Sequence, residues 1–356
     1  MEHLLHKAIL YQQSTDVNYK DAVLCKLCSH YCRISQGKEG TCLTRINLNG
    51  ELYTKTYNQV QSYGIDPIEK KPFFHFKPRS SVLSFGAPGC NFRCLNCQNY
   101  SLSQFYNLTN KQSKIQGYSP EELVQIAVQL GCDGISYTYS EPTIFFELAR
   151  DVILESRRIR GGKELYHVFV SNGYLSIEAL DLIEKENLIS GINIDLKFID
   201  DSSYKRVCSA KMRPVMNTIK RVNELREIMH LEVINLLIPG ENDSIDSITK
   251  LCEFMASVSP DIPLHFNRFH PTYKMDGLHS TEPETMLMAR KIAHSIGIKH
   301  VYLGNISLPD GENTFCPKCK RLLVGRSHFD VGKIAIKPGR SGSECSFCGE
   351  PINFVL

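Results

Sequence analysis

The sequence has 356 residues, of which 42% are hydrophobic and 22% are charged, and its net charge is +3. This is ordinary globular composition and excludes a disordered chain. The near-neutral charge predicts no strong attraction to nucleic acid or to a membrane. The first residues lack the apolar core of a secretion signal, and no apolar stretch is long enough for a membrane helix. We therefore expect a soluble, cytoplasmic protein.

The N-terminal eighty residues are expected to form an extension and a connector that precede the main domain. Apolar residues at helical spacing predict one amphipathic helix, followed by a linker, within residues 1–22. Residues 51–57 follow Asn49-Gly50 and are typical of a hairpin strand. The aromatic and proline-containing segment 66–76 is expected to cover one end of the core.

The chain contains fourteen cysteines, and eleven of them fall into three tight groups. Without a secretion signal, such grouping predicts metal sites rather than disulfides. The first group is Cys25, Cys28, Cys32 and Cys42. Thiolates bind zinc and iron–sulfur clusters alike. This group could therefore hold either kind of metal centre, with a structural role or a role in electron transfer. We expect the three ungrouped cysteines to be small, buried hydrophobic side chains; they are Cys132, Cys208 and Cys252.

Residues 81–305 alternate between strand-like and helix-like segments, which predicts a parallel α/β layer structure. Strands are expected at 81–86, 134–139, 166–171, 191–197, 231–238, 262–268 and 300–304. Helices are expected from Ser119-Pro120, at 143–158 and 176–187, and near 214–229, 244–258 and 283–296. The expected domains are therefore a cysteine-rich extension (1–80), a main domain (81–305) and a C-terminal element (306–356).

Polar residues follow nearly every predicted strand, and no Gly-rich phosphate turn occurs after any of them. In a barrel the carboxyl ends of the strands converge on one mouth, so these scattered residues would form one site. An open doubly wound sheet would instead spread them along an edge. The pattern favours a full or partial TIM-like (β/α) barrel.

Cys90, Cys94 and Cys97 follow the first predicted strand with the spacing C-x3-C-x2-C. Four thiolates saturate a [4Fe–4S] cluster, whereas three leave one iron with an open position. S-adenosylmethionine can occupy that position, and one electron then releases a 5′-deoxyadenosyl radical, which is chemistry that belongs to the cofactor. A zinc knuckle is the simpler alternative for these cysteines.

This cysteine motif resembles the radical S-adenosylmethionine (SAM) superfamily, and GCNFRCLNCQN resembles its pyruvate formate-lyase activating-enzyme branch. The resemblance implies that Ser140 and Glu141, in YTYSEPT, hold the amino group of the cofactor; a helix N-cap is the alternative role. It also implies that Asn172, in the S-N-G turn, belongs to the site. Asn96 replaces the aromatic residue that often packs on adenine, so Phe92 or another residue would take that part.

Two later strands add candidate cofactor-binding residues. Asp195 and Lys197 alternate with Leu196 and so share one strand face, where burial requires that they pair or meet a ligand. The D-L-K pattern also resembles the activating enzymes, although a structural ion pair would explain it too. The segment HFNRFHP supplies His265 and Arg268, which could bind the carboxylate of the cofactor or a substrate.

The third cysteine group is Cys316, Cys319, Cys345 and Cys348, two C-x2-C knuckles. Two thiolates from each knuckle can close a tetrahedral structural site, so we expect a zinc-ribbon-like appendage, with a rubredoxin-like iron site as the alternative.

The order of all these motifs resembles the radical enzymes of the AmmeMemoRadiSam system. The resemblance implies Memo-type and AMMECR-type companion proteins and an electron donor such as flavodoxin or ferredoxin. We expect abstraction of hydrogen from an unknown substrate. The alternatives are an activase for a glycyl-radical enzyme, and a metal-dependent module that binds RNA or protein without catalysis.

Overall fold

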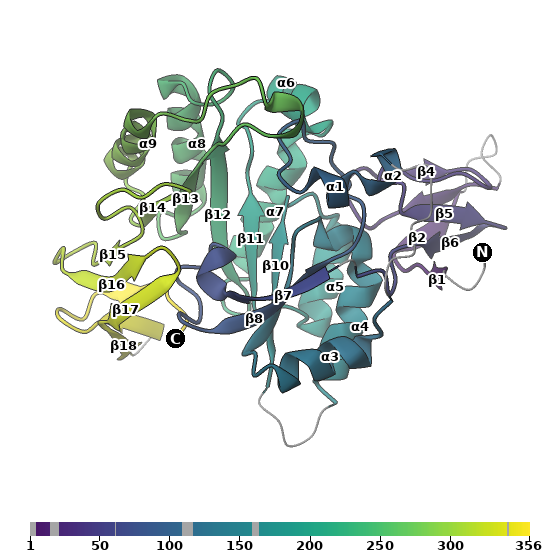
Figure 1. Ribbon diagram of the computed structural model, residues 1–356, viewed down its shortest axis with the longest axis horizontal. Coiled ribbons are helices and arrows are strands. Elements are labelled where there is room, and N and C mark those ends of the chain that lie inside the picture. The colour runs from purple at the N-terminus through teal and green to yellow at the C-terminus, as the bar shows by residue number, and fades with distance from the viewer. Residues whose placement is uncertain (1–4, 15–20, 61, 109–116, 159–163, 340–341) are drawn as a thin grey trace. The chain divides into compact units, whose positions relative to one another are not determined.

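The computed structural model describes residues 5–14, 21–60, 62–108, 117–158, 164–339 and 342–356 (Figure 1). The chain divides into two compact units. The first unit comprises residues 1–65 and 81–190, and the second comprises 66–80 and 191–356. This division cuts the expected 81–305 domain after residue 190 and assigns the connector to the second unit.

The N-terminal part of the first unit is built from strands, not from the predicted helix. One sheet has the order β1 (His6–Lys7), β6 (Glu51–Thr54), β5 (Arg45–Leu48), and another has the order β2 (Tyr11–Gln13), β3 (Val23–Cys25), β4 (Arg33–Ile34). His6 pairs with Thr54 and Tyr11 with Cys25. The prediction of a helix is therefore wrong for residues 5–14, because pairing with distant strands overrides local helical periodicity. Residues 1–4 and 15–20 lie outside the described residues.

The rest of the first unit is a parallel α/β structure. Strands β8 (Ser81–Gly86), β9 (Gly134–Tyr137) and β10 (Tyr166–Ser171) pair in parallel and in chain order. The helices are α1 (Tyr100–Ser103), α2 (Phe105–Leu108), α3 (Pro120–Gln129), α4 (Phe146–Ser156) and α5 (Ile177–Glu186), with a 3-10 turn at Pro142–Phe145. Helix α3 begins with the predicted Ser119 cap, whose side chain and that of Glu122 form a capping box.

The second unit contains the remaining parallel strands. Strands β11 (Gly191–Asp195), β12 (His230–Leu237), β13 (Leu264–Arg268) and β14 (Val301–Gly304) also pair in chain order. The helices are α6 (Asp201–Ser203), a π-turn at Tyr204–Cys208, α7 (Met212–Glu224), α8 (Ile245–Val258) and α9 (Pro283–Ile296), with 3-10 turns at Ile68–Lys70 and Tyr273–Met275. Strand β7 (Ser62–Pro67) crosses the boundary between the units.

The C-terminal part of the second unit is a pair of small antiparallel sheets. One contains β15 (Thr314–Phe315), β16 (Leu322–Ser327) and β17 (Asp330–Ile334), and the other contains β18 (Ile336–Gly339), β19 (Gly342–Cys345) and β20 (Pro351–Ile352). Their shared core combines two of the knuckle cysteines, Cys316 and Cys345, with Leu323, Val324 and Phe354.

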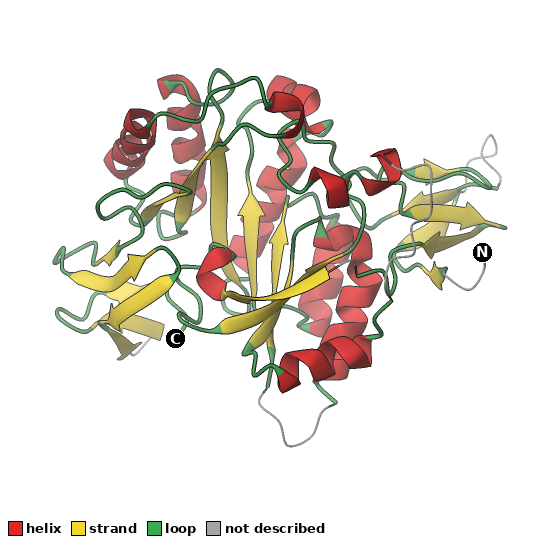
Figure 2. Cartoon of the chain, viewed as in Figure 1, coloured by secondary structure: helices red, strands yellow, loops and turns green. Residues whose placement is uncertain are grey.

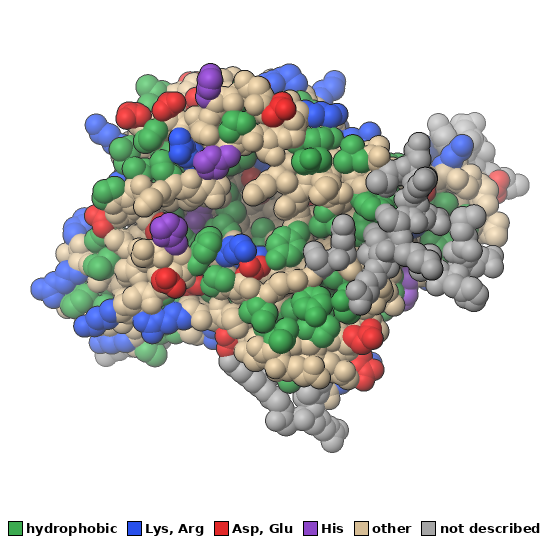
Figure 3. All heavy atoms as spheres, in the orientation of Figure 1, with side chains coloured by type: hydrophobic (Ala, Val, Ile, Leu, Met, Phe, Trp, Pro, Cys, Tyr) green, Lys and Arg blue, Asp and Glu red, His purple; other side chains and the backbone are tan. Residues whose placement is uncertain are grey.

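The predicted α/β class is confirmed, and all seven predicted barrel strands and six barrel helices are present (Figure 2). Within each unit the parallel strands follow chain order, as in a partial (β/α) barrel, without the reversal of a doubly wound sheet. Among the described residues, no helix is both long enough and apolar enough to cross a membrane. Both basic and acidic side chains lie on the face shown in Figure 3.

Candidate metal and cofactor site

The loop that leaves β8 carries Cys90, Cys94 and Cys97. The backbone N–H of Phe92 donates to Cys90 Sγ over 3.3 Å, and Cys97 Sγ lies 3.1 Å from Ser103 Oγ. The loop starts at Gly89, whose φ is +102° and where a Cβ atom would lie 2.5 Å from the Thr44 side chain. Only glycine fits that backbone conformation at that close approach.

The spacing of these three thiols fits a polynuclear cluster better than a single metal ion. In the described part of the chain, only the C-terminal cysteines form a group whose ligand atoms all lie within 4.8 Å of one another. Ligands of one zinc ion would be about 3.8 Å apart, given Zn–S bonds of about 2.3 Å in a tetrahedron. Buried polar atoms without a partner, Asn91 Nδ2 and Asn96 Oδ1, belong to the same loop. The donor set therefore fits an iron–sulfur cluster.

The turn that follows β9 is tied to this loop. Ser140 Oγ donates to the carbonyl of Ala87 over 2.5 Å, and Asn99 Nδ2 donates to the carbonyl of Tyr139 over 2.8 Å. Tyr139 adopts a left-handed backbone conformation, with φ +64°. The turn is thus joined to the residues before and after the cysteines through Ser140 and the Tyr139 carbonyl.

Glu141 joins the ends of β9 and β10. Its Oε1 accepts hydrogen bonds from Thr143 and from Ser171 Oγ (2.8 Å), and its Oε2 accepts one from the backbone N–H of Asn172 (2.7 Å). Burial raises the pKa of this carboxyl, while these donors lower it. Asn172 Nδ2 in turn lies 2.7 Å from Asn91 Oδ1 and 3.9 Å from Cys90 Sγ. The structure therefore brings Cys90, Glu141 and Asn172 together.

Comparisons with known proteins agree with this geometry. Residues 85–252 match the family described as the radical SAM superfamily. An uncharacterized protein of Methanocaldococcus jannaschii is 39% identical over 99% of this chain and 100% of its own length. The chain therefore belongs to the family of this archaeal protein and carries a radical SAM domain.

The similar solved structures bear on the fold. A radical SAM methyltransferase from Sphaerobacter thermophilus matches with a TM-score of 0.50 at 13% identity, covering 64% of this chain and 67% of that chain. A domain of a pyruvate-formate lyase-activating enzyme from Bacteroides vulgatus matches with a TM-score of 0.40 at 20% identity, covering 48% and 99%. Members of the superfamily are enzymes, and a radical SAM domain implies a [4Fe–4S] cluster and S-adenosylmethionine.

Phe92, one candidate for packing on adenine, is otherwise engaged in the radical SAM domain. Its ring is 1% exposed and packs edge-on against Tyr174, with ring centroids 5.1 Å apart. This burial leaves Phe92 little exposed surface for packing on adenine. Asn91 and Thr143, which contact the predicted site residues, were missed; their polar side chains within the two motifs were the available signal.

Asp195 and Lys197 lie at the end of β11 in the second unit. They form the ion pair that was the alternative to ligand binding, with Lys197 Nζ 2.5 Å from Asp195 Oδ2. Asp195 Oδ1 is buried without a partner among the described residues. The side chains of Asn235 and Asn242 hold this strand end by donating to the carbonyl of Lys197, over 3.2 and 2.9 Å. One carboxylate oxygen therefore remains for a ligand.

In the second unit, His265 belongs to a buried network of polar contacts centred on Glu232. His265 Nε2 lies 2.6 Å from Glu232 Oε2, and His230 Nε2 lies 3.1 Å from Glu232 Oε1. Burial would raise the pKa of Glu232, but the two histidines lower it overall. His265 is 2% exposed, and this engagement argues against the predicted cofactor contact. Arg268 is half-buried and donates from Nε to the carbonyl of Thr281 over 2.7 Å, which leaves its terminal amino groups for a ligand.

The four C-terminal cysteines form a compact set in the second unit. All four Sγ atoms lie within 4.8 Å of one another, with Cys316–Cys348 at 3.6 Å and Cys319–Cys345 at 3.8 Å. These distances match the tetrahedral edge expected for one metal ion. A hydrogen bond from the backbone N–H of Arg321 contributes most to lowering the pKa of Cys319 to about 7, which favours the thiolate that a metal requires.

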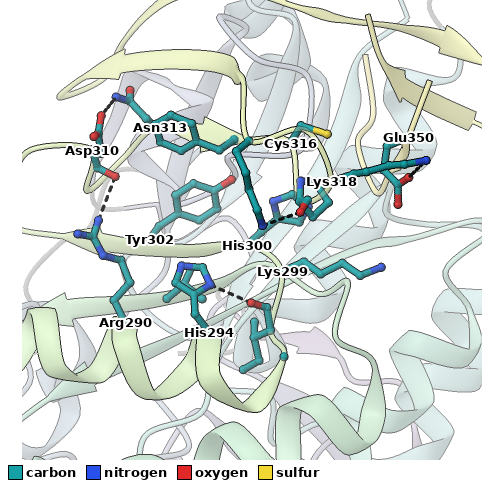
Figure 4. Close-up of a pocket in the computed structure, with 16 residues that line it drawn as sticks. Arg290, His294, Lys299, His300, Tyr302, Asp310, Asn313, Cys316, Lys318 and Glu350 are labelled. Atoms are coloured by element: carbon teal, nitrogen blue, oxygen red, sulfur yellow. Dashed lines mark hydrogen bonds and ion pairs between the residues drawn. The ribbon is translucent and has the colours of Figure 1, made fainter. Parts of the chain in front are cut away.

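A cavity of about 720 Å³ lies between helix α9, the start of β14 and the first C-terminal knuckle (Figure 4). Two cations at its wall already have partners, since Arg290 donates to the Asp310 carbonyl over 3.2 Å and Lys318 lies 3.5 Å from Glu350. The cavity adjoins the amino end of β14, whereas barrel enzymes place their chemistry at the carboxyl ends of the strands. We therefore assign no catalytic role to it.

Proposed function

We propose that this protein is a radical SAM enzyme whose Cys90, Cys94 and Cys97 hold a [4Fe–4S] cluster. The observation that carries the proposal is the three-cysteine loop after β8, where Cys90 is linked through Asn172 to Glu141. When bound at the open iron, S-adenosylmethionine would be cleaved by one electron to methionine and a 5′-deoxyadenosyl radical, which abstracts hydrogen from a substrate.

In this proposal the residues of the two turns have different tasks. Both oxygens of Glu141 accept hydrogen bonds within the protein, so Glu141 acts mainly by positioning Ser171 and Asn172. Ser140 donates its hydroxyl proton to Ala87 and keeps lone pairs that can accept from the cofactor amino group. Asp195 offers its unpartnered Oδ1 as an acceptor, and Arg268 and Lys197 supply cations for a carboxylate.

The finer assignment is to the AmmeMemoRadiSam branch, with Memo-type and AMMECR-type proteins as companions and a flavodoxin or ferredoxin as reductant. Support comes from the order of the motifs along the chain: DPIEKKP, GCNFRC, YTYSEPT and HFNRFHP, flanked by the two groups of four cysteines. The substrate is unassigned. Activation of a glycyl-radical enzyme keeps the same chemistry with a protein substrate. A binding module without catalysis is disfavoured by the radical SAM domain.

The test is anaerobic reconstitution with iron and sulfide, reduction, and assay for 5′-deoxyadenosine from S-adenosylmethionine. Wild type should form the product and Cys94→Ala should not. Cys132→Ala is the matched control, because Cys132 is a buried cysteine of the same unit outside the three groups, and it should retain product formation. Wild-type protein with a full, reducible cluster and no product would refute the proposal.

A further inference from the structure

The four N-terminal cysteines surround one enclosed space in the first unit. Cys25, Cys28, Cys32 and Cys42 all line the same pocket. Its other walls are Leu27, His30, Ile34, Gly40, Thr41, Arg45, Thr143 and Ile144. Four thiols that converge from separate turns on one pocket are a ligand set rather than scattered core residues.

Their spacing differs from that of the C-terminal set. The C-terminal thiols lie within 4.8 Å of one another, but no three of the N-terminal thiols, all of which the structure describes, lie that close together. Thiolates on one zinc ion would be about 3.8 Å apart. In an iron–sulfur cluster four thiolates are shared among two or four iron atoms, so no three of them bind the same iron atom or lie that close together. The N-terminal set resembles Cys90, Cys94 and Cys97 in this respect and not the C-terminal set.

Three of the four sulfurs already receive hydrogen bonds from the protein. Arg45 Nη1 donates to Cys25 Sγ over 3.5 Å, and Thr44 Oγ1 donates to Cys42 Sγ over 3.0 Å. The backbone N–H of Thr41 donates to Cys32 Sγ over 3.5 Å. Such donors stabilise thiolates and tune the reduction potential of an iron–sulfur cluster.

This pocket lies directly against the radical SAM loop. His30 Nε2 is 2.8 Å from the carbonyl of Asn91, between Cys90 and Cys94 in sequence. Thr143, which lines the pocket, also donates to Glu141 from its backbone N–H over 3.1 Å. The two cysteine sites therefore share a wall within one compact unit.

We infer that Cys25, Cys28, Cys32 and Cys42 bind a second, polynuclear iron–sulfur cluster beside the radical SAM loop, and not a zinc ion. Such a cluster supplies a second one-electron carrier. The inference concerns metal content and does not depend on S-adenosylmethionine cleavage, so it can fail while the proposed function holds, and the reverse.

The test removes the other iron site and leaves the N-terminal cysteines intact. The triple variant Cys90→Ala/Cys94→Ala/Cys97→Ala is reconstituted anaerobically, and iron, acid-labile sulfide and zinc are counted per chain. We expect about two or four iron atoms, as four cysteines bind in [2Fe–2S] or [4Fe–4S] clusters, together with visible charge-transfer absorption and an electron paramagnetic resonance signal after reduction.

Adding Cys28→Ser and Cys42→Ser to the triple variant should remove that iron and leave the zinc content of the C-terminal set unchanged. Retained zinc and an unchanged far-ultraviolet circular dichroism spectrum report that the chain is folded. A triple variant that is folded and holds no iron, or that holds two zinc ions per chain, would overturn the inference.

Discussion

Arg45 and Glu147 form a buried ion pair that holds the N-terminal sheets to helix α4, and its removal should strongly destabilise the first unit. Arg45 Nη2 contacts Glu147 Oε1, and the two side chains are 2% and 3% exposed. Burial would lower the pKa of Arg45, but Glu147 and Cys25 raise it overall, so the guanidinium stays charged. The change Arg45→Met would leave the Glu147 carboxylate buried without its cation.

The expected loss is about 3–5 kcal/mol, the usual cost of breaking a buried pair from one side. Glu147→Met should cost a similar amount. The double variant should cost much less than the sum, because a pair of apolar side chains of similar volume leaves no buried charge. It should still be less stable than wild type, since Ile9 loses partners for its carbonyl and its N–H, which now lie 3.0 Å from Arg45 and 2.9 Å from Glu147.

The measurement is urea-induced unfolding followed by far-ultraviolet circular dichroism, with hydrogen exchange of residues 5–14 as the local reporter. The chain has no tryptophan, which excludes the usual fluorescence probe. Lys7→Met is the control, because the Lys7–Glu51 pair joins the same sheet but its side chains are 59% and 43% exposed; its effect should lie within experimental error. Equal losses for Lys7→Met and Arg45→Met, or strict additivity in the double variant, would refute the reasoning.

Three further outcomes are expected. Cys316→Ser should lose the zinc ion expected at the C-terminal cysteines, which inductively coupled plasma mass spectrometry would detect. Because a structural zinc site contributes folding energy directly, the variant should also show faster hydrogen exchange in β16 and β19. Unchanged exchange would contradict a structural role. Burial lowers the pKa of His300 to about 4. Between about pH 6.5 and 4 the unfolded chain therefore binds a proton at this residue that the folded chain does not. As the pH falls through this range, His300 should lower the free energy of unfolding by about 1.4 kcal/mol per pH unit. His300→Asn should reduce that slope in thermal melts by the contribution of one histidine, while His75, His167 and His294, whose pKa values burial also lowers, keep the remainder; an unchanged slope would count against the reasoning. Ser119→Ala should cost about 1 kcal/mol by removing the cap of α3, measured by urea unfolding, whereas a neutral change would show that the capping box is dispensable.

The barrel elements could be predicted from the sequence because each carries a local signal. Continuous apolar runs such as YHVFVS mark strands buried on both faces, and the Ser119-Pro120 start marks a helix. The N-terminal segment carried a misleading signal. Its apolar residues recur at helical spacing, yet the Ala8 N–H donates to the Leu52 carbonyl over 2.8 Å. That partner lies more than forty residues along the chain, so no local pattern identifies it.

The residues of the candidate site also differ in how far the sequence alone identifies them. The cysteines and Glu141 were predictable because they lie in compact motifs. The burial of His265 against Glu232 was not predictable, because Glu232 lies on the neighbouring strand and looks, in sequence, like any charged residue. A histidine in a strand can be a ligand-binding or a structural residue, and the contacts of Glu232 with both His265 and His230 favour the structural role here.

The same local spacing of two cysteines also occurs in two different structural settings. Cys25-x2-Cys28 and Cys316-x2-Cys319 are identical patterns, but Cys25 lies in strand β3, paired with Tyr11, while Cys28 forms a bridge with Leu175. In the C-terminal knuckle the Cys319 N–H donates to Cys316 Sγ over 3.4 Å, and the Lys320 N–H donates to the Cys316 carbonyl over 3.0 Å. A tight turn thus joins Cys316 to Cys319, whereas Cys25 lies in a strand and Cys28 in an isolated β-bridge. Identical cysteine spacing therefore occurs here in two different backbone conformations, which the spacing alone does not distinguish.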